Sequence, residues 1–247
     1  MAAKANVYEV FDSIQGEGPY VGTRQVFVRF QGCPLTCVYC DSTSAKLLES
    51  APQVTCNATR SLRNPVSAKD LTKLVESLWN PSTKYLSLTG GEPLLHTDFV
   101  LELAGEFFGP LYLETNGMFS REAQRLKHAV HVAACDIKLP EHRATATYDL
   151  LLREELRTIE CFHNSQAHVF VKVVVFKETS SETIELVAQR LATIDNNLLL
   201  VLQPVTPHSK TLPPEDNDRL FRLMDAAAAH LNQVRVIPQM HRILGIA

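Results

Sequence analysis

Stretches of apolar, β-branched residues alternate along the sequence with stretches that have the apolar spacing of amphipathic helices. The clearest strand is "HVFVKVVVF" at 168–176, which is nearly all apolar or β-branched, as expected of a strand buried on both faces. The clearest helix covers 67–79, because Ser67 can cap its N-terminus and Asp70 stands at the capping-box position. Strands that alternate with helices predict parallel βα units, and six or seven units fit a complete or partial (βα) barrel. The other expected strands cover 25–30, 84–90, 111–115, 131–138, 197–204 and 233–237, and the other expected helices cover about 98–108, 120–128, 145–160, 181–194 and 215–231.

Short polar motifs follow these expected strands directly. "QGC" comes after the first strand, "TGGEP" after the second, "ETNG" after the third, "DIK" after the fourth and "QPVT" after the sixth. Because the carboxyl ends of parallel strands meet at one end of a barrel, where chemistry collects in such folds, these motifs predict a shared site. Residues 43–66 have weak periodicity and indicate a long loop or insertion after the first motif, of the kind that often acts as a lid.

The composition excludes several classes of function. A net charge of −3 gives no basic field for nucleic acid or an anionic membrane. No apolar run reaches the length that spans a bilayer, and the N-terminus lacks the hydrophobic stretch of a signal peptide. These features indicate a cytoplasmic protein, in which disulfides are not expected among the six cysteines. We expect Cys56, Cys135 and Cys161 to be buried or neutral thiols.

The remaining three cysteines, Cys33, Cys37 and Cys40, form a C-x3-C-x2-C pattern in the loop after the first strand. Thiolates suit zinc or an iron–sulfur cluster. A zinc site would need a fourth ligand, from Cys56 or a histidine, and would make the protein a non-catalytic zinc-binding regulator. A 4Fe–4S cluster held by three cysteines would keep one open iron, which can chelate a small molecule and pass it an electron. The spacing favours the cluster.

The cysteine pattern and "TGGEPLL" at 89–95, in this order, resemble the radical S-adenosylmethionine (SAM) superfamily. The resemblance implies an α/β fold, a partial (βα)6-type TIM barrel of the radical SAM kind, with the whole chain, 1–247, as a single radical SAM domain. It also implies that the open iron binds the amino and carboxylate groups of SAM. An electron from the reduced cluster then cleaves SAM to a 5′-deoxyadenosyl radical, which takes a hydrogen atom from the substrate.

The segment "VYEVFDSIQGEGPYVGTRQVFVRFQGCPLTCVYCDS" at 7–42 resembles the N-terminal signature of the 7-carboxy-7-deazaguanine synthase family. The resemblance continues through "TGGEP", "ETNG", "DIK", "QP" and "QMHRILG" and so covers essentially the whole chain. It implies a carbon–nitrogen lyase of queuosine biosynthesis and tRNA modification. The family converts 6-carboxy-5,6,7,8-tetrahydropterin to 7-carboxy-7-deazaguanine and ammonia by a radical ring contraction, with SAM as a reusable cofactor and Mg²⁺ organising the substrate carboxylate.

The resemblance also implies the site residues, none of them as a catalytic acid or base. The expected cluster ligands are the three clustered cysteines, and the expected magnesium ligand is Ser42, where many members have threonine. The expected substrate contacts are Ile14, Gln15, Gly16, Glu17, Arg29, Thr89, His241 and the chain end, Ala247. The expected SAM contacts are Tyr39, Asp41, Gly91, Glu92, Asp136, Lys138 and Gln203.

The expected partners are a pterin substrate, an electron donor such as flavodoxin or ferredoxin, and a second copy of the chain in a homodimer. One alternative stays within the superfamily: an activase that places a glycyl radical on a partner protein would share the cysteine spacing and "GGEP". Such an enzyme would not need "IQGEG" or the magnesium position at Ser42.

Overall fold

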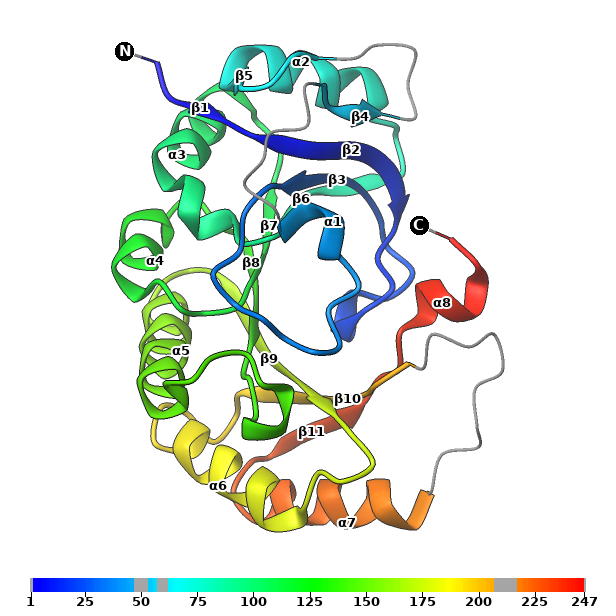
Figure 1. Cartoon of the computed structure of the whole chain (residues 1–247), viewed down its shortest axis with the longest axis vertical. Helices are drawn as coiled ribbons and strands as arrows, with labels where there is room; N and C mark the ends of the chain where they lie inside the picture. The colour runs from blue at the N-terminus through cyan, green and yellow to red at the C-terminus, as the bar shows by residue number, and fades with distance from the viewer. Residues whose placement is uncertain (1, 47–52, 57–61, 207–216, 247) are drawn as a thin grey trace.

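The computed structural model describes residues 2–46, 53–56, 62–206 and 217–246. Its main element is a nine-stranded sheet, whose strands lie side by side in the order β11 (Gln233–Val236), β10 (Leu199–Pro204), β9 (His168–Val175), β8 (Val132–Asp136), β7 (Leu111–Thr115), β6 (Thr83–Gly90), β3 (Arg24–Phe30), β2 (Val7–Ile14) and β4 (Thr55–Cys56). The strands from β3 to β11 run parallel, and only β2 is antiparallel to its neighbour β3 within this described sheet. Since β11 and β4 form separate edges, the curved sheet is an open, partial barrel, as the sequence predicted (Figure 1).

Helices cover the outer face of this sheet (Figure 1). They are α2 (Ala68–Leu78), α3 (Thr97–Glu106), α4 (Ser120–Leu126), α5 (Tyr148–His163), α6 (Ser181–Ala192) and α7 (Asn217–Ala228). Short elements fill the connections: β1 (Lys4–Ala5), which pairs with β5 (Val66–Ser67), the single turns η1 (Gly18–Tyr20), η2 (Pro93–His96) and η3 (Pro140–His142), and the small helices α1 (Thr43–Lys46) and α8 (Met240–Leu244). No helix in the described part of the chain combines the length and apolar character that a membrane crossing requires.

Most of the expected elements are confirmed within a few residues. Helix α2 begins as its capping signal predicts, since the backbone N–H of Asp70 donates to the Ser67 hydroxyl at 3.2 Å. The helix that the sequence predicted at about 145–160 is α5, which begins and ends slightly later, at Tyr148 and His163. The predicted loop at 43–66 is described only in part: it contains α1, β4 and β5, while 47–52 and 57–61 lie outside the described residues. A lid role for it remains a prediction.

The hairpin that joins β2 to β3 enters the barrel. Tyr20, in η1 of this hairpin, packs edge-to-face against Tyr85 and Tyr112, with ring centroids 5.6 and 5.5 Å apart. These rings and Phe170 form a small inner core between the strands, separate from the main core beneath the helices. The tyrosine end of the hairpin therefore closes the interior near the start of β6, which leaves the opposite, carboxyl end of the strands open.

Two glycines bring the loops after β3 and β6 into backbone contact. A Cβ atom on Gly91 would lie 1.9 Å from the carbonyl oxygen of Gly32, and a Cβ on Gly90 would lie 2.5 Å from the backbone of Phe30. The Glu92 N–H donates to the same Gly32 carbonyl at 2.8 Å. Gly90 also has a φ of +114°, which side-chain-bearing residues rarely adopt. This contact positions the start of the cysteine loop against "TGGEP".

We expect Gly91→Ala to destabilise the fold by about 1–3 kcal/mol, because the new methyl group overlaps backbone that cannot rotate away. The matched control is Gly105→Ala in α3, where an added Cβ meets nothing within 4 Å and a helical alanine is favoured by up to about 1 kcal/mol. Denaturant unfolding of both variants measures the difference. Equal stability of Gly91→Ala and the wild type would contradict the close contact.

Candidate active site

A cavity of about 610 Å³ opens at the carboxyl ends of the barrel strands. Nearly all of the residues that the sequence predicted for the site line this cavity, although they come from separate segments of the chain. Those that line it are Ile14, Gln15, Gly16, Glu17, Arg29, Cys33, Cys37, Tyr39, Cys40, Asp41, Ser42, Thr89, Gly91, Asp136, Lys138, Gln203 and His241. Glu92 lies behind the wall, and Ala247 lies outside the described residues.

The cysteine loop lies between two fixed neighbours. On one side is the backbone contact with Gly91. On the other side, the backbone N–H groups of Thr36 and Val38 donate to the carbonyls of Ala144 and His142, at 2.9 and 3.1 Å, in the connection between β8 and α5. Leu35, within the loop, is buried beside Leu151 of α5. The loop backbone is therefore held in place by protein contacts on both sides.

The three cysteines fit an iron–sulfur cluster better than a single zinc ion. Cys33, Cys37 and Cys40 are all partly exposed and face the same cavity. In the described part of the chain, the three sulfurs do not all lie within 4.8 Å of one another. Tetrahedral zinc would require them to lie closer, because zinc–sulfur bonds of about 2.3 Å place the ligands about 3.8 Å apart. The Asn116 side-chain amide approaches the Cys33 sulfur at 3.6 Å. Wide spacing, open access and soft donors suit a larger cluster with a face toward the cavity.

Glu92 of "TGGEP" is fully buried and forms hydrogen bonds with residues of the cavity wall near the cysteines. Its carboxylate accepts from the Thr115 hydroxyl at 2.8 Å and from the Asn116 backbone N–H at 2.8 Å. Burial raises the pKa of Glu92 to about 7, although these hydrogen bonds act in the opposite direction. In this structure the carboxylate thus orients two residues that line the cavity, and a direct contact of Glu92 with SAM stays a prediction.

Three of the residues predicted for the SAM side, Tyr39, Asp136 and Lys138, form one connected group. The Lys138 ammonium contacts Asp136 at 2.6 Å and the Tyr39 hydroxyl at 3.1 Å. The Tyr39 ring packs edge-to-face on His142 and Phe176, which fixes its plane. Lys138 and Lys172 lower the pKa of Asp136 even though its burial acts to raise it, so this carboxylate is ionised at neutral pH.

Gln203 adds an unsatisfied group to this side. Its side-chain oxygen is buried and has no hydrogen-bond partner among the described residues. Because a buried amide oxygen without a partner is costly, its position in the cavity wall favours a bound ligand that donates to it.

Three of the residues predicted for the substrate side, Gln15, Glu17 and Thr89, are linked in a second group through Glu114. The Gln15 side chain donates to Glu114 at 2.9 Å and accepts from the Glu17 backbone N–H at 3.0 Å. The Thr89 hydroxyl donates to the other Glu114 oxygen at 2.7 Å. Burial acts to raise the pKa of Glu17, but the contact with Lys172 outweighs it and lowers the pKa to about 2. The cavity therefore presents an ionised carboxylate from "IQGEG".

Arg29 lies in β3 with its guanidinium fixed on several sides. Its Nε donates to Glu9 at 2.7 Å, its Nη1 donates to the Ser42 hydroxyl at 2.8 Å, and the group lies 5.5 Å from the Phe11 ring centre. The Ser42 hydroxyl donates in turn to Asp41 at 3.1 Å. Ser42 keeps one lone pair, and Arg29 keeps further N–H donors, for a ligand in the cavity.

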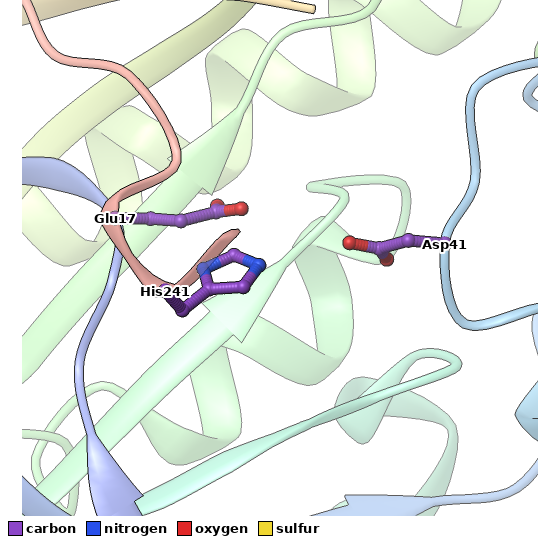
Figure 2. A group of neighbouring side chains, drawn as sticks. All are labelled: Glu17, Asp41 and His241. Atoms are coloured by element: carbon purple, nitrogen blue, oxygen red, sulfur yellow. The ribbon is translucent and has the colours of Figure 1, made fainter. Parts of the chain in front are cut away.

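The C-terminal segment reaches back over the cavity. The Met240 N–H donates to the Gly16 carbonyl at 2.8 Å, and a Cβ on Gly16 would lie 2.4 Å from the ring of His241. Figure 2 shows Glu17, Asp41 and His241 pointing toward one another from the hairpin, the cysteine loop and α8. Their ligand atoms all lie within 4.8 Å of one another, as for a metal site.

Two cations already compensate the carboxylates of that trio. Lys172 contacts Glu17, and Arg242 lies 3.7 Å from Asp41. A divalent ion placed among them would lie beside two positive side chains, which opposes its binding. The trio is better suited to a polar organic ligand than to an ion of its own.

Several polar residues of the cavity wall carried no role in the sequence prediction, among them Glu114, Asn116, Lys172 and Gln239. Glu114 and Asn116 belong to "ETNG", which was noted as a motif at a strand end. Lys172 is the one charged residue within the expected buried strand at 168–176, and such a residue needs a buried partner. Gln239 opens "QMHRILG", which belongs to the family resemblance, but its contact with Glu17 depends on where the chain end folds.

Comparison with known proteins agrees with this geometry. The family model described as the radical SAM superfamily matches residues 27–191. A curated 7-carboxy-7-deazaguanine synthase of Methanocaldococcus jannaschii is 36% identical, over 97% of this chain and 99% of its own length. The enzyme of the same name from Methanothermobacter thermautotrophicus is also 36% identical, over 98% of each chain.

Solved structures share the fold. The crystal structure of QueE from Escherichia coli has a TM-score of 0.60 and 21% identity, covering 96% of this chain and 95% of its own. The structure of Streptococcus suis SuiB bound to S-adenosylmethionine has a TM-score of 0.55 and 14% identity, over 84% of this chain and 48% of its own. From the match to the family model, the identity over the full length of two relatives and the cysteine-lined cavity, the chain belongs to the radical SAM superfamily and, within it, to the 7-carboxy-7-deazaguanine synthase family.

Proposed function

We propose that this chain is a 7-carboxy-7-deazaguanine synthase, a carbon–nitrogen lyase that converts 6-carboxy-5,6,7,8-tetrahydropterin to 7-carboxy-7-deazaguanine and releases ammonia. The reaction serves queuosine or a related deazapurine, and through queuosine the modification of tRNA. The observation that carries the proposal is full-length similarity, at 36% identity, to relatives of that name. The cavity supports it, because cysteine ligands and a substrate-type set of polar groups line the same space.

The cofactors of this family are a 4Fe–4S cluster and SAM, which together supply the removal of a hydrogen atom from the substrate. Cys33, Cys37 and Cys40 would hold the cluster. Tyr39, Asp41, Gly91, Glu92, Asp136, Lys138 and Gln203 remain our proposed SAM contacts. The proposal is supported by the connected group of Tyr39, Asp136 and Lys138 and by the unsatisfied oxygen of Gln203.

The substrate side offers the complementary chemistry. A pterin edge presents N–H donors, and ionised Glu17 with Gln15 and Glu114 presents acceptors fixed by their own hydrogen bonds. Arg29 would take the substrate carboxylate with its remaining donors, since a guanidinium binds a carboxylate through two parallel hydrogen bonds. Ile14, Gly16, Thr89, His241 and the chain end Ala247 complete the proposed substrate contacts.

We propose that the Ser42 hydroxyl would bind Mg²⁺, which would organise the substrate carboxylate. A single hydroxyl is a weak anchor for Mg²⁺, which keeps most of its waters, so the substrate must supply further oxygen ligands. The lone pair that Ser42 keeps supports this place, and the negative charge of the substrate carboxylate would offset the positive charge of Arg29 beside it.

We further propose a cytoplasmic homodimer whose 247 residues act as one radical SAM domain and receive electrons from flavodoxin or ferredoxin. Family resemblance supports these points. Sedimentation of the reconstituted protein tests the dimer, and reduction of the cluster by each purified donor tests the electron source.

Anaerobic incubation of the reconstituted protein with SAM, reductant, Mg²⁺ and the carboxypterin tests the proposed activity. We expect 7-carboxy-7-deazaguanine, detected by its ultraviolet spectrum and mass, and one equivalent of ammonia. SAM cleavage without the deazapurine would instead indicate another radical SAM activity, such as activation of a glycyl-radical enzyme.

The cluster should depend on the three clustered cysteines and not on Cys56. Cys56 lies in β4, where it pairs with β2 and packs against the main core. Anaerobically reconstituted Cys56→Ala should keep about four irons per chain, whereas alanine at Cys37 should lose them. Iron and sulfide analysis measures both. Loss of iron from Cys56→Ala would show that the ligand set is wrong.

Arg29→Ala should weaken substrate binding by roughly thirtyfold to several thousandfold, equivalent to about 2–5 kcal/mol, and Arg29→Lys should also weaken it, because lysine cannot form the paired hydrogen bonds. The matched control is Arg24→Lys, at the other end of the same strand, where the guanidinium pairs with Asp12 away from the cavity. Binding of the carboxypterin and of SAM is measured separately. A fall in SAM affinity as large as that for the carboxypterin would contradict the assignment of Arg29.

Ser42→Ala should retain the cluster and SAM cleavage but lose most of the stimulation of turnover by Mg²⁺. Ser42→Thr is the control, since threonine keeps the hydroxyl that the ion needs. Titration of Mg²⁺ at fixed substrate compares the three proteins. Equal stimulation in the wild type and Ser42→Ala would leave Ser42 only its hydrogen bonds to Arg29 and Asp41.

A further inference from the structure

Lys172 is a charged residue within an otherwise apolar part of β9. Its neighbours along the strand, Val171 and Val173, are fully buried on the helix-covered side, which turns Lys172 toward the cavity. Its side chain is only 13% exposed. A buried ammonium is stable only when carboxylates surround it, so its partners show what the lysine does.

The partners come from both halves of the cavity. Lys172 contacts Glu17, which belongs to the proposed substrate side, and lies 3.4 Å from Asp136 Oδ1, which belongs to the proposed SAM side. Glu114 also attracts it. The other Asp136 oxygen, Oδ2, contacts Lys138. A continuous series of contacts thus runs from the substrate side through Lys172 to the SAM side.

The two contacts of Lys172 are unequal. The ammonium lies closer to Glu17 than to Asp136, for which the separation is 3.4 Å. When N–H donors of a ligand form hydrogen bonds with the Glu17 carboxylate, they weaken its attraction for the Lys172 ammonium. The ammonium is then drawn toward Asp136, which would be held between two lysines, Lys172 and Lys138, in one orientation.

We propose that Lys172 is a positioning residue that couples the two halves of the site, so that carboxypterin bound at Glu17 fixes Asp136 for SAM and SAM bound at Asp136 fixes Glu17 for carboxypterin. The inference rests on the proposed function for the identity of the two ligands. Linkage requires that each ligand tighten the binding of the other by the same factor.

Equilibrium binding to the reconstituted protein with an oxidised cluster and no reductant tests the coupling, because neither ligand is then consumed. The dissociation constant of SAM is measured with and without saturating 6-carboxy-5,6,7,8-tetrahydropterin, and that of the carboxypterin with and without SAM. In the wild type we expect each ligand to tighten the other about fivefold or more, equally in both directions.

Lys172→Met removes the charge and keeps the length of the side chain. We expect its coupling factor to fall to within about twofold of one, with the iron content of the wild type. Lys172→Arg keeps a positive charge and should recover part of the coupling. The control is Lys69→Met, on the exposed face of α2, which should couple as the wild type does.

Two results would overturn the inference. One is a wild type in which neither ligand affects the other, a measurement that does not depend on how the variants fold. The other is a Lys172→Met protein whose coupling equals that of the wild type. In either case, conversion of carboxypterin by the wild type would leave the proposed function standing. A wild type that neither binds nor converts carboxypterin would overturn the proposed function and this inference together.

Discussion

The site depends on one backbone contact, between the loop that follows β3 and the loop that follows β6. Gly91 leaves no room for a side chain against the Gly32 carbonyl, and the Glu92 N–H donates to that carbonyl. The same Glu92 then holds Thr115 and Asn116 at the end of β7. Three neighbouring strand ends are therefore fixed relative to the cysteine loop before any cofactor binds, which reduces the ordering that binding would otherwise require.

Buried charge organises the rest of the cavity. Glu17 and Asp136 are ionised because Lys172 and Lys138 lie against them. Their fixed carboxylates can accept hydrogen bonds from neutral polar ligands without further rearrangement, which is the usual basis of orientation in an enzyme site. The same network joins Glu17 and Asp136 through one buried cation, Lys172.

The sequence could predict the part of this site that follows from local rules. Alternating strands and helices place "TGGEP", "ETNG" and "DIK" at one end of a parallel sheet, whatever the details of packing. The antiparallel β2, the tyrosine end of its hairpin inside the barrel and the return of Gln239 over Glu17 depend on contacts between distant segments. Lys172 was visible as a charge within an apolar strand, but its partners became clear only from the three-dimensional arrangement.

The proposed function requires that the ligand on the proposed SAM side lie in direct reach of the ligand on the proposed substrate side. Turnover of carboxypterin that carries deuterium on its ring carbons, followed by the mass of the recovered SAM and of any 5′-deoxyadenosine, tests this most directly. We predict deuterium in these molecules, because a hydrogen atom removed from the substrate would cross the shared cavity. Formation of the deazaguanine without any deuterium in either molecule would contradict the arrangement.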